Sequence, residues 1–367
     1  MRVLMVHPHD IYNPLEPWTI RITALAGCLT RLGHEVKLVY HLARPEVLPG
    51  TAQHRQEFPF EVIPRIRHMG LGVRKSREMT ELARWADIVH VQKALSHAAL
   101  PAALAALWNG IPLHYDWDDW EAAIYEDAVG TRDKHWRRIQ RFEQALPRIA
   151  DTISVASAAL RKQALAMGLP PDRLFDAPVG ADLDRFRCGG DGEKIRSELG
   201  LDGPIAVYLG QLAGAHAAPL FLDAAARVAK EQPDAGFLVI GGGQTLPEVK
   251  EHAARLGIAQ RVRFTGAISH ARVPDYLDVA DLAVATLPDS PQAATKSPLK
   301  VVEYMAAGKA IVASRVGEAV RFLDEGRVGE LVPAGSAPAL AEAMSRLLAD
   351  PYRRSELGVP AREHLRR

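Results

Sequence analysis

The stretch SPLKVVEYMAAGKAIVAS, residues 297–314, predicts a short helix followed by a buried strand. Ser297 is a favoured N-cap residue, and Pro298 suits the first helical position, where a missing N–H costs nothing. Gly308 can adopt the left-handed conformation that ends a helix, and residues 310–313 form the apolar run AIVA. The predicted unit is therefore helix, glycine, strand.

Two charged residues of this helix point to a binding site. Lys300 and Glu303 are three apart, so we expect them to share a face near the positive N-terminal end. The N–H groups of Leu299 and Lys300 could bind a phosphate, and Glu303 could accept hydrogen bonds from a diol such as ribose. The alternative is an ordinary Lys–Glu pair on a solvated face, worth a few tenths of a kcal/mol. This stretch alone favours the alternative, whereas the rest of the chain favours the binding site.

Composition places the chain among soluble globular proteins. Its 367 residues, 48% hydrophobic and 24% charged, are enough for two domains with large cores. A net charge of +1 argues against nucleic acid as a partner. Cys28 and Cys188 have no metal-like spacing, so neither a disulfide framework nor a zinc site is expected. The opening MRVLMVHP lacks the core of a signal peptide, and no run of about 18 apolar residues follows, so we expect a cytoplasmic protein.

Apolar runs and helical patterns alternate along the chain, which is typical of parallel βαβ units. The alternation starts afresh after a polar, glycine-rich segment, residues 188–192. We therefore predict an N-terminal Rossmann-like domain over 1–182, a second one over 183–345, and a C-terminal tail over 346–367 that returns toward the first domain. Two doubly wound domains that face each other would leave a cleft at the carboxyl ends of their strands.

The helix motif at 297–309 resembles the donor-binding helix of the retaining glycosyltransferases of family 4, which have the GT-B fold of two facing Rossmann-like domains. Four further segments extend the resemblance over nearly the whole chain by their order and spacing: PVGAD at 178–182, YLGQL at 208–212, IGGG at 240–243 and VRFTG at 262–266.

The resemblance implies transfer of a hexose from a nucleotide diphosphate sugar to an acceptor hydroxyl with retention, without a metal or a further cofactor. Glu303 would hold the ribose, Lys300 would meet the diphosphate, and the leaving phosphate itself would act as the base. His216 completes the implied catalytic set. The implied donor-binding residues are Gly210, Gln211, Thr265, Gly266, Ala267, Lys296, Ser297, Pro298, Leu299 and Glu303.

Several positions depart from the family pattern. Two cations that many relatives direct at the diphosphate are replaced by Gln211 and Ala215-His216, and His216, Lys296 or Lys300 are the candidate substitutes. An acidic residue expected eight positions before Glu303 falls at Thr295. These losses motivate an alternative, a nucleotide-sugar-binding partner subunit with weakened catalysis. The intact Lys300 and Glu303 favour the enzyme.

Acceptor-side residues are expected in the first domain. The place of Trp18 and Arg21 after the first strand suggests these two, and the resemblance adds Gln92, Lys93, Asp116, Asp118 and Asp119. Trp18 could stack on a sugar and Arg21 could touch phosphate; the alternative is that Trp18 packs under its loop and Arg21 pairs with Glu16. Gln92 replaces a catalytic-looking His of some relatives. Asp118-Asp119 fall where many relatives carry His-Asp.

Two basic segments, 65–77 and 132–148, suit an anionic membrane surface or a phosphate-bearing acceptor. Solvated helix faces are the commoner alternative. The expected partners are the nucleotide-sugar donor and a sugar, lipid-linked or small-molecule acceptor. Peripheral contact with the inner face of the membrane is a further expectation.

Overall fold

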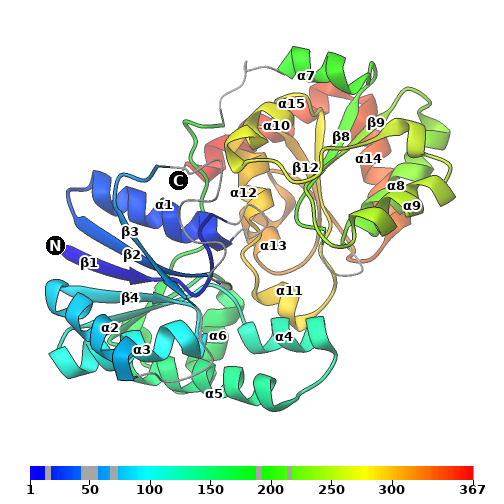
Figure 1. Ribbon diagram of the computed structural model, residues 1–367. Coiled ribbons are helices and arrows are strands. Elements are labelled where there is room, and N and C mark those ends of the chain that lie inside the picture. The colour runs from blue at the N-terminus through cyan, green and yellow to red at the C-terminus, as the bar shows by residue number, and fades with distance from the viewer. Residues whose placement is uncertain (13–17, 43–56, 67–72, 187–191, 213–216, 367) are drawn as a thin grey trace. The chain divides into compact units, whose positions relative to one another are not determined.

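The computed structural model describes residues 1–12, 18–42, 57–66, 73–186, 192–212 and 217–366. The chain divides into two compact units, one formed by Met1–Pro178 with Thr295–Ser297 and the other by Val179–Ala294 with Pro298–Arg367. Each unit is a parallel sheet with helices on both faces (Figure 1). The predicted α/β class with two Rossmann-like sheets is therefore confirmed.

The first unit contains a seven-stranded parallel sheet in the order β3-β2-β1-β4-β5-β6-β7. Its elements are β1 Arg2–Val6, α1 Trp18–Arg31, β2 Glu35–Leu42, β3 Glu61–Ile66, α2 Val73–Trp85, β4 Ile88–Gln92, α3 Ser96–Asn109, β5 Leu113–Trp117, α4 Glu121–Val129, α5 Lys134–Ile149, β6 Thr152–Val155, α6 Ala158–Ala166, the 3-10 turn Pro171–Arg173 and β7 Leu174–Asp176.

Alternating side chains of the strands build two core layers in this unit. Met5 of β1 faces α1, where it packs with Ile22, whereas Leu4 and Val6 face the layer formed with α2, α3, α5 and α6. The strand order reverses between β1 and β4, and ligands of such sheets bind beyond the carboxyl ends of the strands at such a switch point.

The second unit contains a six-stranded parallel sheet in the order β10-β9-β8-β11-β12-β13. Its elements are α7 Gly192–Leu199, β8 Ile205–Leu209, α8 Ala217–Glu231, β9 Gly236–Ile240, α9 Leu246–Arg255, the turn Ala259–Arg261, β10 Val262–Phe264, the turn His270–Arg272, α10 Val273–Asp278, β11 Leu282–Ala285, α11 Pro291–Thr295, α12 Leu299–Ala306, β12 Ala310–Ser314, α13 Glu318–Phe322, the turn Asp324–Gly326, β13 Glu330–Val332, α14 Ala337–Ala349 and α15 Pro351–Leu365.

Here too the sheet is covered on both faces. Tyr208 of β8 packs into a layer with α8, α9 and α14, whereas Val207 packs into a layer with α7, α10, α12 and α15. The switch point of this sheet lies between β8 and β11. The predicted donor helix, α12, is buried beside it.

The start of α12 differs from the prediction. The helix begins at Leu299, its N-cap is Pro298, and no side chain caps it, so the predicted N-cap role of Ser297 is wrong. Pro298 has φ −75° and ψ 102°, an extended rather than helical conformation, which delays the first turn by one residue. The predicted end is confirmed, because Gly308 has φ 65° and β12 follows.

The division of the chain also differs from the predicted one. The boundary falls at Pro178, four residues before the predicted 182, and residues 298–367 all belong to the second unit. There α15 packs on α12, α14 and β12. The predicted return of residues 346–367 toward the first domain stays a prediction.

Candidate functional site

Three glycine-containing loops meet at the carboxyl ends of β8, β9 and β10. Gly210 N–H donates to the Ile240 carbonyl at 3.0 Å, and Gly241 and Gly266 form an isolated bridge. Gly241 has φ 135°, and a Cβ there would lie 2.0 Å from the Gly210 carbonyl oxygen. Only glycine permits this approach. The loops thus bring together backbone groups that a phosphate or a base could meet.

Other predicted donor residues lie in the same loops. The Thr265 hydroxyl accepts a hydrogen bond from Gly241 N–H at 3.3 Å and donates to the Gly266 carbonyl at 2.7 Å. A Cβ at Gly242 would lie 2.7 Å from the backbone nitrogen of Ala267, which places that residue against the same loop. The structure therefore brings Gly210, Thr265, Gly266 and Ala267 together.

Close packing predicts different costs for two glycines of positive φ in this unit. We expect Gly241→Ala to destabilise the second unit by about 3 kcal/mol or more, because the new Cβ overlaps the Gly210 carbonyl. Gly257→Ala is the matched control: its φ is 73° but nothing lies within 4 Å, so about 1 kcal/mol is expected. Urea unfolding, assigned to the unit by hydrogen exchange, measures both. Equal costs would contradict the packing argument.

Lys300 of α12 reaches the same place. Its Nζ lies 4.3 Å from the centroid of the Tyr208 ring, and a Cβ at Gly210 would lie 2.8 Å from that Nζ. The next turn of the helix is fixed by Tyr304, whose hydroxyl accepts from Leu209 N–H at 2.7 Å and donates to the Val284 carbonyl at 3.3 Å. The ammonium is thus held beside the end of β8, where it would stabilise a bound anion.

Glu303 is buried, with 3% of its surface exposed, and Oε1 lies 2.5 Å from Nε2 of His270. The alternative interpretation of a Lys–Glu pair on a solvated face is wrong. Instead each residue has its own partner: Lys300 faces Tyr208, and Glu303 faces His270. An ionised carboxylate held in this way keeps further acceptor positions.

The remaining predicted donor residues are less well placed. Gln211 is exposed just after Gly210. Lys296 and Ser297 belong to the first unit, so their predicted part in donor binding stays a prediction. Residue 216, the predicted catalytic His216, lies outside the described residues.

A buried polar cluster occupies the switch point of the first unit. His7 follows β1 and its Nδ1 lies 2.7 Å from Gln92 Oε1; the Gln92 amide in turn donates to Asp118 Oδ2 at 2.7 Å. Gln92 is fully buried. Gln92, which departs from the family pattern, therefore links the residue after β1 to the segment after β5.

Lys93 forms ion pairs with the acidic residues that follow β5. It has φ 65°, is 2% exposed, and its Nζ lies 3.4 Å from Asp118, 2.7 Å from Asp119 and 2.5 Å from Glu121. Burial alone would lower the pKa of Lys93, but these charges outweigh it and hold the pKa well above its usual range. Burial raises the pKa of Asp118 despite the neighbouring ammonium.

Asp118, Asp119 and Glu121 are also a group of carboxylates close enough to share a metal ion within the described residues. The Lys93 ammonium already forms ion pairs with all three and donates hydrogen bonds to Asp119 and Glu121, so they do not fit a resident metal. That the reaction needs no metal or further cofactor stays a prediction.

Arg21 has a different partner from either of those expected. Two of its nitrogens donate to the two Asp116 oxygens at 2.8 and 2.7 Å, and the pair is almost fully buried. Ser154 donates to Asp116 as well, at 2.6 Å. Burial would raise the pKa of Asp116, but the Arg21 charge holds it well below its usual range. Glu16 lies outside the described residues. The pair joins α1 to β5.

Trp18, at the start of α1, has ring contacts with two neighbours. Its ring centroid lies 5.3 Å from that of His9, and Lys93 Nζ lies 5.3 Å from the same ring. The acceptor-side roles of Trp18, Arg21 and the cluster around Lys93 stay predictions.

His90 of β4 provides a test of the buried polar layer by pH. Its Nε2 lies 3.9 Å from Asp116, and burial lowers its pKa to about 3, with His114 adding to the effect. Its contribution to stability is thus present above the unfolded pKa of about 6.5 and is lost as the pH falls. As the pH falls from 7 to 4.5, we expect the free energy of unfolding of wild type to decrease by about 2 kcal/mol more than that of His90→Asn, as measured by urea unfolding. A constant difference would contradict this, and His34→Asn, at a partly exposed position, is the control.

Three functional candidates escaped the sequence analysis: His270, His7 and Glu121. His270 and Glu303 are 33 positions apart, and no spacing rule connects a three-residue turn to a helix. Glu121 could have been suspected from its place just after Asp118-Asp119. His7 directly follows a strand that leads to a switch point, which is a usable signal.

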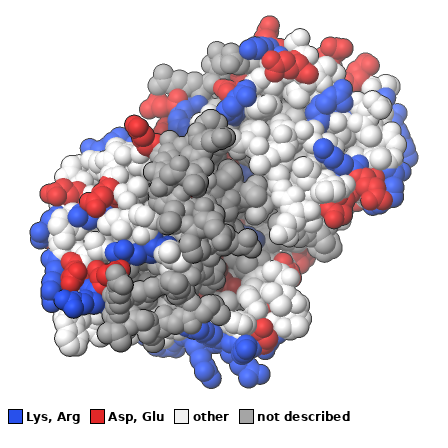
Figure 2. Space-filling model, viewed as in Figure 1, with Lys and Arg blue, Asp and Glu red and all other residues white. Residues whose placement is uncertain are grey.

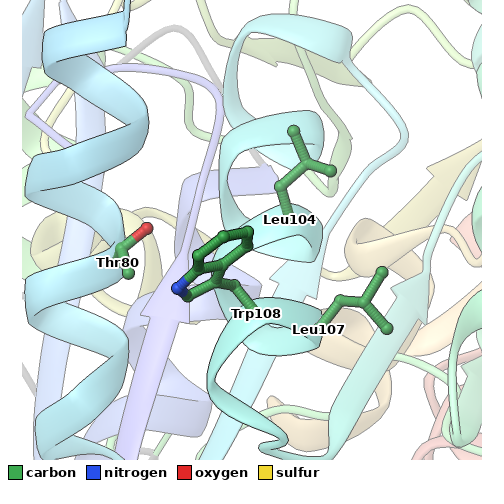
Figure 3. A pocket seen from close by; sticks show the side chains of 4 residues that line it. All are labelled: Thr80, Leu104, Leu107 and Trp108. Carbon is green, nitrogen blue, oxygen red and sulfur yellow. The ribbon is translucent and has the colours of Figure 1, made fainter.

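An apolar hollow lies on α2 and α3, lined by Thr80, Leu104, Leu107 and Trp108. Figure 3 shows the Trp108 indole between the two helices, facing Thr80. Trp108 is at the end of α3 that leads back to the amino end of β5, opposite the strand ends where the polar cluster lies. None of the predicted site residues lines it.

Comparison with known proteins agrees with this geometry. Residues 19–180 match the family model described as glycosyl transferase 4-like domain, and residues 203–350 match that of glycosyl transferases group 1. The D-inositol 3-phosphate glycosyltransferase of Corynebacterium glutamicum is 30% identical over 293 residues, which are 76% of this chain and 68% of that protein. A GDP-mannose-dependent phosphatidylinositol monomannoside mannosyltransferase of Mycolicibacterium smegmatis is 29% identical over 62% of this chain and 61% of its own.

Solved structures show the same fold. The Anabaena protein HepE in complex with UDP-glucose has a TM-score of 0.76 at 18% identity, covering 100% of this chain and 94% of that one. Sucrose-phosphate synthase from Thermosynechococcus elongatus has a TM-score of 0.73 at 19% identity, with the same coverage. At such identity the likeness concerns the fold alone.

Two doubly wound parallel sheets of this kind define the GT-B class of proteins, as predicted. The chain belongs to glycosyltransferase family 4, the group 1 glycosyl transferases. The matches span 52%, 61% and 50% of the lengths of the first three curated relatives.

Proposed function

We propose that this protein transfers a hexose from a nucleotide diphosphate sugar to an acceptor hydroxyl, with retention at the anomeric carbon. The observation that carries the proposal is the joint placement of Lys300, Glu303 and the Gly210 loop in the second unit. This region lies within the segment that matches the group 1 glycosyl transferases.

Each of these groups has a part in donor binding. Lys300 and the uncapped first N–H groups of α12 meet the diphosphate and stabilise the negative charge that develops as it leaves. Glu303 accepts hydrogen bonds from the ribose hydroxyls. Thr265, Gly266 and Ala267 lie beside the base. The leaving phosphate takes the proton of the acceptor hydroxyl, which keeps the incoming group on the face that the leaving group vacates.

The relatives suggest different donors and acceptors. One is named as GDP-mannose-dependent and acts on a phosphatidylinositol monomannoside, one is a D-inositol 3-phosphate glycosyltransferase, and one is an α-D-kanosaminyltransferase of Streptomyces kanamyceticus. Sugar transfer is common to these names, and the first of them states a nucleotide-sugar donor. The comparisons do not favour the alternative of a partner subunit with weakened catalysis.

The proposal is tested by a donor screen followed by product analysis. UDP-, GDP- and ADP-sugars are added in a thermal-shift assay, where a donor that binds the folded state raises the melting temperature. The stabilising donor is then incubated with inositol phosphate and sugar acceptors, and the anomeric configuration of the product is read by NMR. Stabilisation with retention supports the proposal. If no donor stabilises the protein and none is transferred or hydrolysed, the proposal is wrong.

Peripheral contact with an anionic membrane is a second proposal, favoured by α5. The exposed side chains of this helix include Lys134, Arg137, Arg138, Arg141 and Arg148 but no acid, because its only carboxylate, Glu143, is buried. Figure 2 shows a group of Lys and Arg side chains at the lower edge of the view, over α5. Within the described residues, no helix combines the length and apolarity needed to cross a bilayer. The proposed location is the cytoplasm, at the membrane face.

Co-sedimentation with liposomes measures this contact. We expect binding to vesicles that contain anionic lipid, loss of binding at high salt, and loss in the triple variant Arg137→Glu, Arg138→Glu, Arg141→Glu, since each basic residue near such a surface contributes about 1 kcal/mol. Charge reversal of Arg227 and Lys230, exposed on α8, is the matched control. Equal sedimentation with neutral and anionic vesicles would exclude the electrostatic contact.

A further inference from the structure

We propose that His270 is a positioning residue for the donor: its imidazole fixes the Glu303 carboxylate in the orientation that receives the ribose. This inference rests on the proposed function, because it takes Glu303 to be the group that meets the donor. No comparison assigns a role to His270.

The contact itself is short and sheltered. His270 Nε2 lies 2.5 Å from Glu303 Oε1, and the two side chains are 26% and 4% exposed. An ionised carboxylate only accepts hydrogen bonds, so Nε2 carries the proton in this contact. The bond holds one oxygen of Glu303, and the carboxylate has acceptor positions left for a diol. His270 therefore orients Glu303 without occupying all the acceptor positions of the carboxylate.

The imidazole can act as a fixed support because its backbone is also held. His270 opens the turn His270–Arg272, whose preceding residue, Ser269, accepts a hydrogen bond from Ala271 N–H. The His270 carbonyl accepts from the Arg185 guanidinium at 3.2 Å. Two independent contacts thus hold this turn, one from its own cap and one from a distant segment.

Arg185 lies in a segment that is fixed in the second unit. Its N–H donates to the Asp182 carbonyl at 3.1 Å, and Arg362 of α15 donates to the Leu183 and Phe186 carbonyls at 2.9 and 2.6 Å. A chain of hydrogen bonds therefore runs from α15, through residues 182–186, to the His270 turn and Glu303. Arg185 therefore supports the position of Glu303 indirectly, through its hydrogen bond to the His270 carbonyl.

The loss of donor affinity on replacement of His270 follows from the preorganisation of the Glu303 side chain. Without His270, the Glu303 side chain regains rotamers that it must lose again when the donor binds. We expect His270→Ala to raise the donor KM and the Kd for the nucleotide about tenfold, with kcat changed by less than about threefold. A loss of chemistry would instead lower kcat with KM unchanged.

Two conservative variants distinguish positioning from general damage. The amide nitrogen of Gln can reach the place of Nε2, whereas that of Asn reaches only the place of Nδ1. We therefore expect His270→Gln to keep affinity within about threefold and His270→Asn to behave like His270→Ala. His252→Ala is the matched control, because His252 Nε2 makes a similar contact, 2.7 Å from Asp223 Oδ1, elsewhere in the same unit. It should leave the donor KM unchanged.

The test titrates UDP, and GDP and ADP in the same way, into wild type, the His270 variants, Glu303→Gln and the double variant His270→Ala/Glu303→Gln by calorimetry. If His270 acts through Glu303, its replacement has little further effect in the Glu303→Gln background. A Glu303→Gln variant that loses affinity while His270→Ala does not, or additive losses in the double variant, would overturn this inference alone. Unchanged affinity in Glu303→Gln, or no binding of the three nucleotides to wild type, would overturn the proposed function with it.

Discussion

Replacing Glu303 by Ala is expected to lower kcat/KM for the nucleotide-sugar donor by about 100-fold. The ribose hydroxyls would lose a charged acceptor, and a hydrogen bond to a charged group is worth about 1.5–3 kcal/mol, or roughly 10- to 150-fold. Steady-state kinetics with the donor found in the screen measures the loss. Wild-type turnover in a folded Glu303→Ala protein would contradict the assignment of the donor site.

The controls follow from the burial of Glu303. Because Glu303 is only 3% exposed, the Ala variant leaves a cavity and a His270 without its partner, so some loss of stability is expected. Glu303→Gln keeps the size and removes only the charge, so it should lose activity with a smaller change in melting temperature. Glu330→Gln, a partly buried glutamate paired with Arg346 in the same unit, should keep full activity.

Replacing Arg21 by Met is expected to destabilise the first unit by about 3–5 kcal/mol. The buried Asp116 would lose both hydrogen bonds from the guanidinium, and removal of one partner of a buried pair leaves an uncompensated charge. Urea unfolding followed by hydrogen exchange of peptides from the first unit measures the change. The transition of the second unit should stay in place.

Arg2→Met is the matched control, because Arg2 and Asp87 form a pair of similar geometry whose side chains are 45% and 39% exposed. Solvent screens such a pair, so only a small shift of the unfolding midpoint is expected. Equal shifts for the two variants would show that burial does not govern the strength of these pairs. The double variant Arg21→Met/Asp116→Leu should recover much of the loss, since it removes the orphaned charge.

The sequence was sufficient for features that depend on local chemistry. The apolar run at 310–313 lies in β12, Ala310–Ser314, as predicted, and Gly308 ends α12 as a left-handed residue. The order of the motifs was sufficient to identify the family. Each of these features is determined by residues within one element or one turn, so a single sequence can show it.

The partners of the buried charges were not predictable in this way. Arg21 and Asp116 are 95 positions apart and meet because α1 covers the face of the sheet on which Asp116 lies. The burial of Glu303 was not predictable for a related reason: α12 is short and buried nearly all round, with Val302 and Tyr304 beside Glu303 also inside. In such a helix a carboxylate gives no sign of which side faces water.

The glycines that join β8, β9 and β10 limit how the specificity of this protein can change. Gly241 and Gly243 hold their neighbours where any Cβ would lie about 2 Å from a carbonyl oxygen, 2.0 Å for Gly210 and 2.2 Å for Leu212. These two positions leave no room for a side chain, so the floor of the proposed donor site is made of main chain. A change of donor preference must come from the side chains that border it, and a library aimed at new donors should vary those and leave the floor alone.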